Sequence, residues 1–219
     1  MNVKIAPSIL AADFTQLGDE VQSVLDAGAD LIHFDVMDNH FVPNLTFGPP
    51  VLKALRKRFP ETAFDVHLMV EPAERLVEEF GDVGASMISV HPETCEDVHA
   101  TLASVRARGI QAGIVLNPDV SDDVVSTLWD ELDYVLVMSV KPGFGGQAFM
   151  PEVLPKLTRL RDRIRSDARD VMLEIDGGIG ATTIRQAAQA GAEVFVAGSA
   201  IFNATDYGAT IAELRSLAA

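Results

Sequence analysis

Two histidines and two aspartates with the chemistry of metal ligands stand at the ends of three apolar segments. His33 and Asp35 are two residues apart, so on a strand both project to the same face. His67 and Asp176 end two further apolar segments. One such histidine is usually a hydrogen-bonded core residue, but a buried aspartate is costly unless it is paired or metal-bound. Together the four residues predict a site for Zn²⁺, Fe²⁺ or Mn²⁺.

Glycine motifs that could hold a phosphate follow two successive apolar segments near the end of the chain. Gly177 and Gly178 follow the first, and Gly198 and Ser199 follow the second. Glycine lets the backbone come close to an anion and present its N–H groups. The net charge of −15 means that any phosphate must be attracted locally, by such groups, by a helix N-terminus or by a metal. The two motifs therefore predict a phosphate site.

A third glycine-rich segment has the composition of a closing loop. It consists of Gly143, Phe144, Gly145 and Gly146. Three glycines around a phenylalanine suit a loop that closes over a substrate and excludes water. The alternative is a flexible surface connection.

Three methionines near strand ends form another candidate group: Met37, Met69 and Met138. Methionine is usually core filler. The first two share strand faces with Asp35 and His67, so they could also form an apolar cap over a reacting carbon.

The elements that must position these residues are eight short apolar, β-branched segments, each followed by a helical pattern. They cover residues 3–10, 31–38, 63–70, 87–91, 111–117, 134–140, 171–176 and 194–197. Near-continuous apolar strands are typical of parallel strands buried on both faces. Eight such units predict a (β/α)8 TIM barrel, whose active site lies at the C-terminal ends of the strands. An open doubly wound sheet is less consistent, because no G-x-G-x-x-G turn follows the first strand.

Composition limits the possible partners. The 219 residues, 48% of them hydrophobic, suit one barrel domain over residues 1–219. No signal peptide is recognisable, and no apolar run approaches the ~20 residues of a membrane span. We expect a soluble, cytoplasmic protein. The net charge of −15 argues against nucleic acid or an anionic membrane as a partner. Cys95 is the only cysteine, so an intrachain disulfide is impossible.

Taken together, these motifs resemble the ribulose-phosphate 3-epimerase family from the first strand to the last. The resemblance is carried by APSILAADF (6–14), HFDVMDNHFVPN (33–44), DVHLMV (65–70), MSVKPGFGGQ (138–147), DGGI (176–179) and AGS (197–199). It implies a TIM barrel of the ribulose-phosphate-binding type and an isomerase of the pentose phosphate pathway and Calvin cycle. It also implies a sugar phosphate as substrate and a homo-oligomer.

The resemblance also implies roles for individual residues. One divalent metal ion per subunit (Zn, Fe, Mn or Co) would be bound by His33, Asp35, His67 and Asp176, and the two aspartates would be the acid/base pair. Ser8 and His67 would contact the substrate. The phosphate would be held by Gly177, Gly178, Gly198 and Ser199, the lid would run from Gly143 to Gly146, and the cap would be formed by Met37, Met69 and Met138.

One residue departs from the family pattern, and one pattern of the family is kept without an assigned role. Asn39 stands where the family commonly has glycine, and asparagine tolerates a positive φ, so the turn can survive. His91-Pro92-Glu93 keeps a His-x-Glu pattern of the family to which the sequence assigns no role.

The expected chemistry is inversion at a carbon next to a ketone. One carboxylate removes a proton from one face and another returns a proton to the opposite face, with Asp35 as base and Asp176 as acid from ribulose to xylulose. An epimerase of a six-carbon ketose phosphate, such as allulose 6-phosphate, is an alternative. A barrel lyase would need a catalytic lysine, and only Lys141 lies near a strand end. A non-catalytic metabolite-binding barrel is a third reading, which four filled ligand positions oppose.

Overall fold

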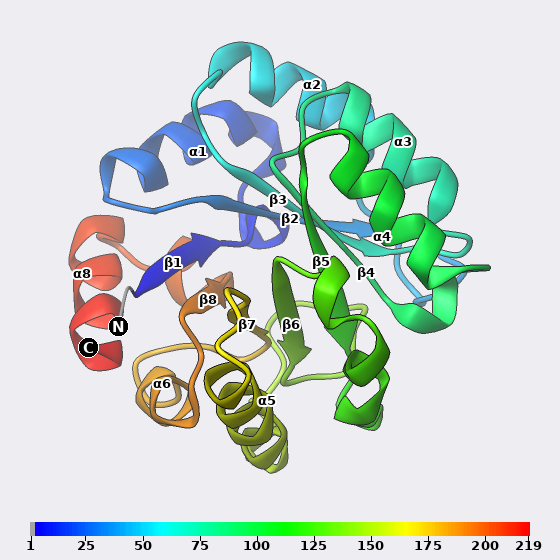
Figure 1. Cartoon of the computed structure of the whole chain (residues 1–219). Helices are drawn as coiled ribbons and strands as arrows, with labels where there is room; N and C mark the ends of the chain where they lie inside the picture. Colours follow the sequence, from blue (N-terminus) through cyan, green and yellow to red (C-terminus); the bar gives the residue numbers. More distant parts are fainter. Residues whose placement is uncertain (1–2) are drawn as a thin grey trace.

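The computed structural model describes residues 3–219, and its strands form one parallel barrel (Figure 1). The strand order is β1-β8-β7-β6-β5-β4-β3-β2, and every pairing is parallel. The predicted (β/α)8 barrel is thereby confirmed. The strands are β1 Lys4–Pro7, β2 Ile32–Met37, β3 Phe64–Met69, β4 Met87–Val90, β5 Gln111–Leu116, β6 Tyr134–Met138, β7 Met172–Asp176 and β8 Val194–Ala197.

The barrel closes between β1 and β2 by a short set of contacts. Ser8 and His33 form a parallel bridge. The backbone N–H of Asp30 donates to the Ile5 carbonyl at 3.0 Å, and the Ile5 N–H donates to Oδ2 of Asp30 at 2.7 Å. Arg215 donates to the same carboxylate oxygen at 2.8 Å. The C-terminal helix therefore supports the closing seam, beside which it lies in Figure 1.

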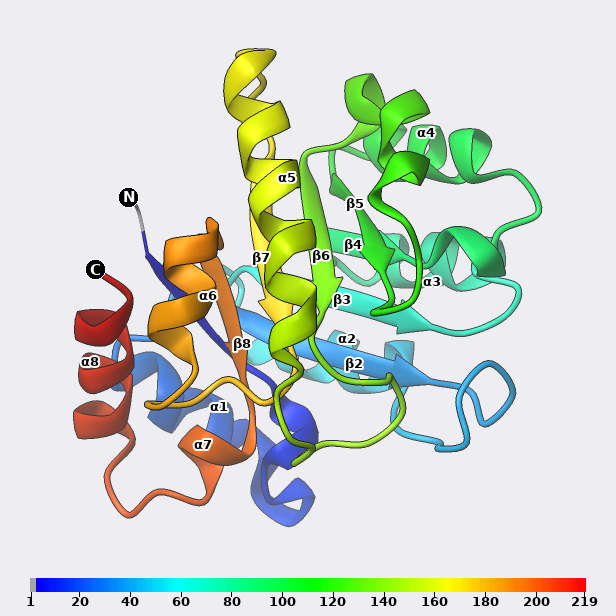
Figure 2. The same cartoon turned by 90° about the horizontal axis from the view of Figure 1, so that it is seen from below.

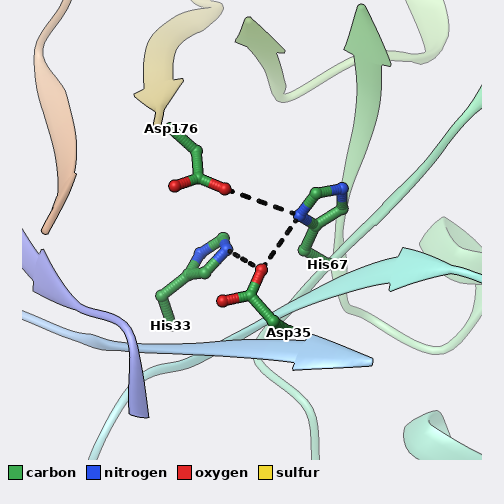
Figure 3. Close-up of side chains that lie close together, drawn as sticks. All are labelled: His33, Asp35, His67 and Asp176. Carbon is green, nitrogen blue, oxygen red and sulfur yellow. Dashed lines mark hydrogen bonds and ion pairs between the residues drawn. The ribbon is translucent and has the colours of Figure 1, made fainter. Parts of the chain in front are cut away.

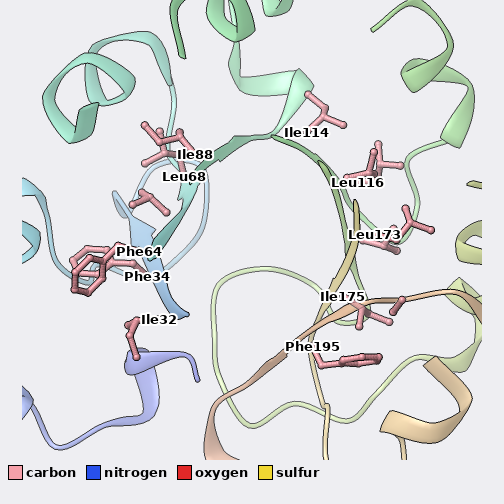
Figure 4. Packing of buried hydrophobic residues seen from close by; sticks show 14 of the residues in the cluster. Ile32, Phe34, Phe64, Leu68, Ile88, Ile114, Leu116, Leu173, Ile175 and Phe195 are labelled. Carbon is pink, nitrogen blue, oxygen red and sulfur yellow. The ribbon is translucent and has the colours of Figure 1, made fainter. Parts of the chain in front are cut away.

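Side chains of one strand alternate between the barrel interior and the helical layer. In β2, Ile32 and Phe34 belong to the main apolar core, whereas His33 and Asp35 meet other polar groups inside the barrel. Figure 4 shows the outward-facing side chains around the ring of strands. Burying a large apolar side chain contributes about 1.5–3 kcal/mol. This outer layer therefore stabilises the barrel while its interior remains available for polar residues.

The helices cover the outside of the barrel. They are α1 Leu17–Asp26, α2 Pro49–Arg58, α3 Glu74–Asp82, α4 Val98–Ala107, α5 Leu154–Ser166, α6 Ile184–Ala190, α7 Ser199–Phe202 and α8 Tyr207–Ala218. Glycines 28, 84 and 191, which follow three of them, have φ angles of 94°, 95° and 122°. Glycine adopts this left-handed conformation without steric cost, so the helix ends expected from these residues are confirmed. Among residues 3–219, no helix is long and apolar enough to span a bilayer.

Two segments differ from the expected strands and helical patterns. After β5, where a helical pattern was expected, two 3₁₀ helices span Asp122–Thr127 and Trp129–Glu131. Ser121 caps the first, but the aspartate, valine and threonine residues that follow have low α-helix propensity. The first strand ends at Pro7 rather than residue 10, because Ser8 caps the 3₁₀ turn Ile9–Ala11 by accepting from the Leu10 N–H.

Candidate active site

A cavity of 480 Å³ opens at the C-terminal ends of the strands. Figure 2 shows the long loop after β6 at the same end of the barrel. All the candidate catalytic, metal, substrate, lid and cap residues line this cavity except His33 and His67, which are wholly buried. The lining residues are Ser8, Asp35, Met37, Met69, Met138, Gly143, Phe144, Gly145, Gly146, Asp176, Gly177, Gly178, Gly198 and Ser199. Further lining residues that the sequence analysis missed include Leu10, Asn44, Gln147 and Asn203.

The four candidate metal ligands converge at the bottom of this cavity (Figure 3). Oδ1 of Asp35 lies 3.3 Å from Nε2 of His33 and 3.3 Å from Nδ1 of His67. Oδ2 of Asp176 lies 3.9 Å from the same His67 nitrogen. One ligand atom from each residue lies within 4.8 Å of all the others. The structure thus brings together four residues from three separate strands.

The donor set fits a cation. Nε2 of His33 is buried and has no hydrogen-bond partner among residues 3–219, although it lies beside the Asp35 carboxylate. Nδ1 of His33 is 2.6 Å from Oδ2 of Asp65. Burial opposes charge on His33, but Asp35 and Asp65 outweigh it and hold its pKa well above the usual range. Without a metal, His33 therefore tends to carry a proton on each ring nitrogen. The resulting positive charge is the one that these carboxylates favour.

The two aspartates of the cluster have opposite pKa shifts. Burial favours the neutral form of Asp35, but His33 and His67 outweigh it and hold the pKa of Asp35 below its usual range. Burial and the neighbouring Asp35 raise the pKa of Asp176 to about 7. At neutral pH the site therefore holds one ionised carboxylate beside one that readily carries a proton.

A second polar layer, not assigned a role from the sequence, lies beneath the four residues. The Tyr134 hydroxyl donates to Oδ1 of Asp65 at 3.0 Å, and Oε1 of Glu174 lies 3.6 Å from Nδ1 of His33. Burial, followed by the charge of Asp65, raises the pKa of Glu174 to about 8. Strand alternation could have located both acids, because each precedes a candidate ligand by two residues.

The three candidate cap methionines all line the cavity but pack in two groups. Met37 and Met69 are paired in the β2–β3 register and pack with Val42. Met138 packs in a separate cluster with Leu136 and others. The cavity wall is therefore apolar on two sides of the carboxylates.

The glycine motif after β7 adopts backbone conformations that would be strained in residues other than glycine. Gly177 and Gly178 have φ angles of 121° and 62°. A Cβ on Gly178 would lie 2.5 Å from the backbone nitrogen of Phe149, in the loop after β6. The phosphate-loop candidate therefore packs closely against the backbone of the segment that follows the lid candidate in the same loop.

The loop after β2 is tied to the lid candidate. Nδ2 of Asn44 donates to the Gly143 carbonyl at 2.9 Å. Asn39, at the start of the same loop, has a φ of 58°, so the expected left-handed turn is confirmed. Phe144 at the tip of the lid candidate is 53% exposed, which leaves its ring free to move over the cavity.

Comparison with known proteins identifies the family of the chain. Residues 4–202 match the model of the "Ribulose-phosphate 3 epimerase family". The chain is 51% identical over 212 residues to ribulose-phosphate 3-epimerase of Escherichia coli K12, covering 97% of this chain and 94% of the relative. It is 50% identical over 203 residues to that of Serratia marcescens, covering 93% and 97%.

Solved structures with low sequence identity share the fold. A 3-keto-L-gulonate-6-phosphate decarboxylase from Vibrio cholerae is 17% identical with a TM-score of 0.71, covering 100% of this chain and 98% of the other. A 3-hexulose-6-phosphate synthase from Salmonella typhimurium is 19% identical with a TM-score of 0.70, also covering 100% and 98%. At this identity the likeness shows the barrel alone.

The barrel, the paired carboxylates and the relatives define an isomerase of the epimerase class. The chain belongs to the ribulose-phosphate 3-epimerase family.

Proposed function

We propose that this chain interconverts D-ribulose 5-phosphate and D-xylulose 5-phosphate by inversion at C3, with Asp35 and Asp176 as the acid/base pair. The observation that carries the proposal is that these two carboxylates face one cavity with opposite pKa shifts. The family of the chain and the names of its relatives support the substrate.

The positions of the two carboxylates suit transfer on opposite faces of a substrate. Asp35 belongs to β2 and Asp176 to β7, with β1 and β8 between them on the short way round the barrel. From ribulose to xylulose, ionised Asp35 takes the C3 proton, and protonated Asp176 returns a proton to the other face. The reverse reaction exchanges these roles. The apolar wall around Met37, Met69 and Met138 keeps water from the reacting carbon.

The proposed cofactor is one divalent ion per subunit, drawn from Zn, Fe, Mn or Co, held by His33, Asp35, His67 and Asp176. Such an ion would act as a Lewis acid that stabilises negative charge on the substrate oxygens. Nitrogen and carboxylate donors in this combination are typical of these metals.

The remaining lining residues would bind the rest of the substrate. Ser8 donates its hydroxyl proton to Oδ2 of Asp35, so it stands where it could also contact the substrate. His67 is fully buried and does not line the cavity, and its Nδ1, which faces the two aspartates, would bind the metal, so a direct contact of His67 with the substrate stays a prediction. The phosphate would be bound by backbone N–H groups of Gly177, Gly178, Gly198 and Ser199, under a lid formed by Gly143, Phe144, Gly145 and Gly146.

The alternatives have less support. The family match and the relatives favour the five-carbon substrate over a six-carbon one. A lysine-centred lyase has no candidate base, since no lysine lines the cavity within the described part of the chain. A homo-oligomeric state and a cytoplasmic location remain predictions.

The test is conversion of D-ribulose 5-phosphate by the metal-loaded chain, beside Asp35→Asn and Asp176→Asn. Loss of a positioned acid or base lowers the rate by about 10²–10⁴-fold, so both variants should fall by that factor. A rate in either variant within a few fold of the wild type would refute the two-carboxylate mechanism. Higher kcat/KM on allulose 6-phosphate would replace the substrate.

A further inference from the structure

His91 and Glu93 lie beside the metal-ligand cluster but have no part in the mechanism proposed above. His91 follows β4 and is fully buried. Its ring stacks on that of His67, with centroids 5.1 Å apart and an interplanar angle of 28°. The two Nε2 atoms are 2.9 Å apart, which is hydrogen-bond distance. The side of His67 that faces away from the cluster is therefore bonded to a second histidine.

The proton count at this contact permits two arrangements. One of the two Nε2 atoms must carry the proton and the other must accept it. If His91 donates, a neutral His67 carries its own proton on Nδ1, which faces Asp35 and Asp176. If His67 donates, its Nδ1 presents a lone pair to the cluster. Only the second arrangement leaves His67 able to bind a metal through that atom.

Glu93 favours the second arrangement. Its Oε1 lies 3.8 Å from Nδ1 of His91, a buried nitrogen that has no hydrogen-bond partner among the described residues. A carboxylate attracts an N–H and repels a lone pair at the same position. The His91 proton is therefore favoured on Nδ1, which makes its Nε2 the acceptor and His67 the donor. Oδ1 of Asp35, 3.3 Å from Nδ1 of His67, favours the opposite arrangement in metal-free protein, so Glu93 competes with Asp35 for the tautomer until a cation takes Nδ1.

The carboxylate is itself held in place. Nδ2 of Asn117 donates to Oε1 of Glu93 at 2.6 Å. The backbone carbonyl of Asn117 accepts from Nζ of Lys156 at 2.7 Å, and Lys156 is only 6% exposed. Glu93 is exposed, but it is thus anchored through the residue that follows β5 to α5.

We propose that Glu93, acting through His91, stabilises the tautomer of His67 that leaves Nδ1 free for a divalent cation. Glu93 and His91 are then positioning residues for the metal site. The proposal rests on the proposed function for one point only, namely that the cluster binds a metal ion. The tautomer itself is read in metal-free protein, so it can fail or hold independently of any epimerase activity.

The direct test is ¹⁵N NMR of histidine-labelled, metal-free protein, in which the two neutral tautomers have distinct nitrogen shifts. The His67 signals are assigned by their loss in His67→Asn. Relative to the wild type, Glu93→Gln should shift the His67 population from the tautomer protonated at Nε2 toward the one protonated at Nδ1. Glu96→Gln, which removes the same charge three residues further on, should match the wild type. An unchanged His67 tautomer in Glu93→Gln would overturn the proposal.

The second readout is Zn²⁺ affinity, measured by competition with a chromophoric chelator. Removing a group that orients a ligating histidine by hydrogen bonding costs about 10–100-fold in metal affinity. Glu93→Gln should lower the Zn²⁺ affinity by a factor that approaches this range. His91→Leu, which removes the acceptor, should bind less tightly than His91→Gln, whose carbonyl can still accept. Thermal unfolding of each metal-free variant separates this effect from misfolding. Wild-type affinity in a folded His91→Leu would also overturn the proposal.

Discussion

Replacing Gly178 by alanine tests whether the phosphate-loop candidate is held against the segment that follows the lid candidate in the loop after β6. The new Cβ would lie 2.5 Å from the backbone nitrogen of Phe149, 2.8 Å from its Cα and 3.0 Å from the Gln147 carbonyl oxygen. All three are backbone atoms, so no flexible side-chain end can move aside. The residue also has a φ of 62°, which alanine adopts only with strain.

The expected cost has two parts. A left-handed alanine costs about 1–2 kcal/mol, partly offset by about 0.4–1 kcal/mol from the stiffer unfolded chain. Overpacking against the loop adds about 1–3 kcal/mol, for a total of about 1–5 kcal/mol. Gly109→Ala is the matched control, since its φ is 74° and no atom of the described residues lies within 4 Å of its Cβ. The control should cost about 0–1.6 kcal/mol.

Urea unfolding of the two variants measures these free energies, and steady-state kinetics on D-ribulose 5-phosphate measures the effect on the site. A displaced loop should raise KM in Gly178→Ala, because misplacement by about 1 Å can cost ~10²-fold. The control should retain wild-type kinetics. If the two variants unfold at the same urea concentration and share one KM, the inferred contact between the two loops is wrong.

Three further predictions concern the buried acid, the metal and the lid. Because the pKa of Glu174 is raised to about 8, the metal-free folded chain retains a proton that the unfolded chain releases. Its stability should therefore fall as the pH rises from about 4 to about 8, and Glu174→Gln should flatten the Tm–pH curve, to which Asp176 and His33 add slope of the same sign and His67 slope of the opposite sign; an unchanged curve would contradict this. Chelation should lower the free energy of unfolding of the metal-loaded protein, measured in urea. Metal added at 100 times its Kd should restore about 2.7 kcal/mol of it. Identical unfolding curves with and without chelator would count against the cluster as a metal site. Phe144→Ala should change stability by less than about 0.5 kcal/mol, since the ring is 53% exposed, but raise KM; a wild-type KM would remove Phe144 from the lid.

Much of the fold could be predicted because its signals are local. Each strand is an apolar segment buried on both faces, and glycines at left-handed positions end the helices. The 3₁₀ segments between β5 and β6 could not be predicted as such. Their apolar residues have helical spacing, and only low α-helix propensity together with packing on the barrel separates the two helix types.

The four candidate ligands were found because strand alternation and the barrel rule place them at one level of one mouth. The second layer was not assigned from the sequence. Asp65, Tyr134 and Glu174 come from three strands, and their contacts depend on the register between those strands. Gly113 in β5 leaves the room that the Tyr134 ring occupies, a relation that no spacing along the chain reveals.

The sequence by itself therefore determined the barrel, the strand ends that carry chemistry and the family to which the chain belongs, because these depend on residue type and short-range period. Only the tertiary structure decided which atom of each histidine faces the cluster, which of two aspartates is held ionised and which tends to keep its proton. Those properties arise from burial and from charges on neighbouring strands. Both depend on distances of a few ångströms between residues that are far apart in the chain.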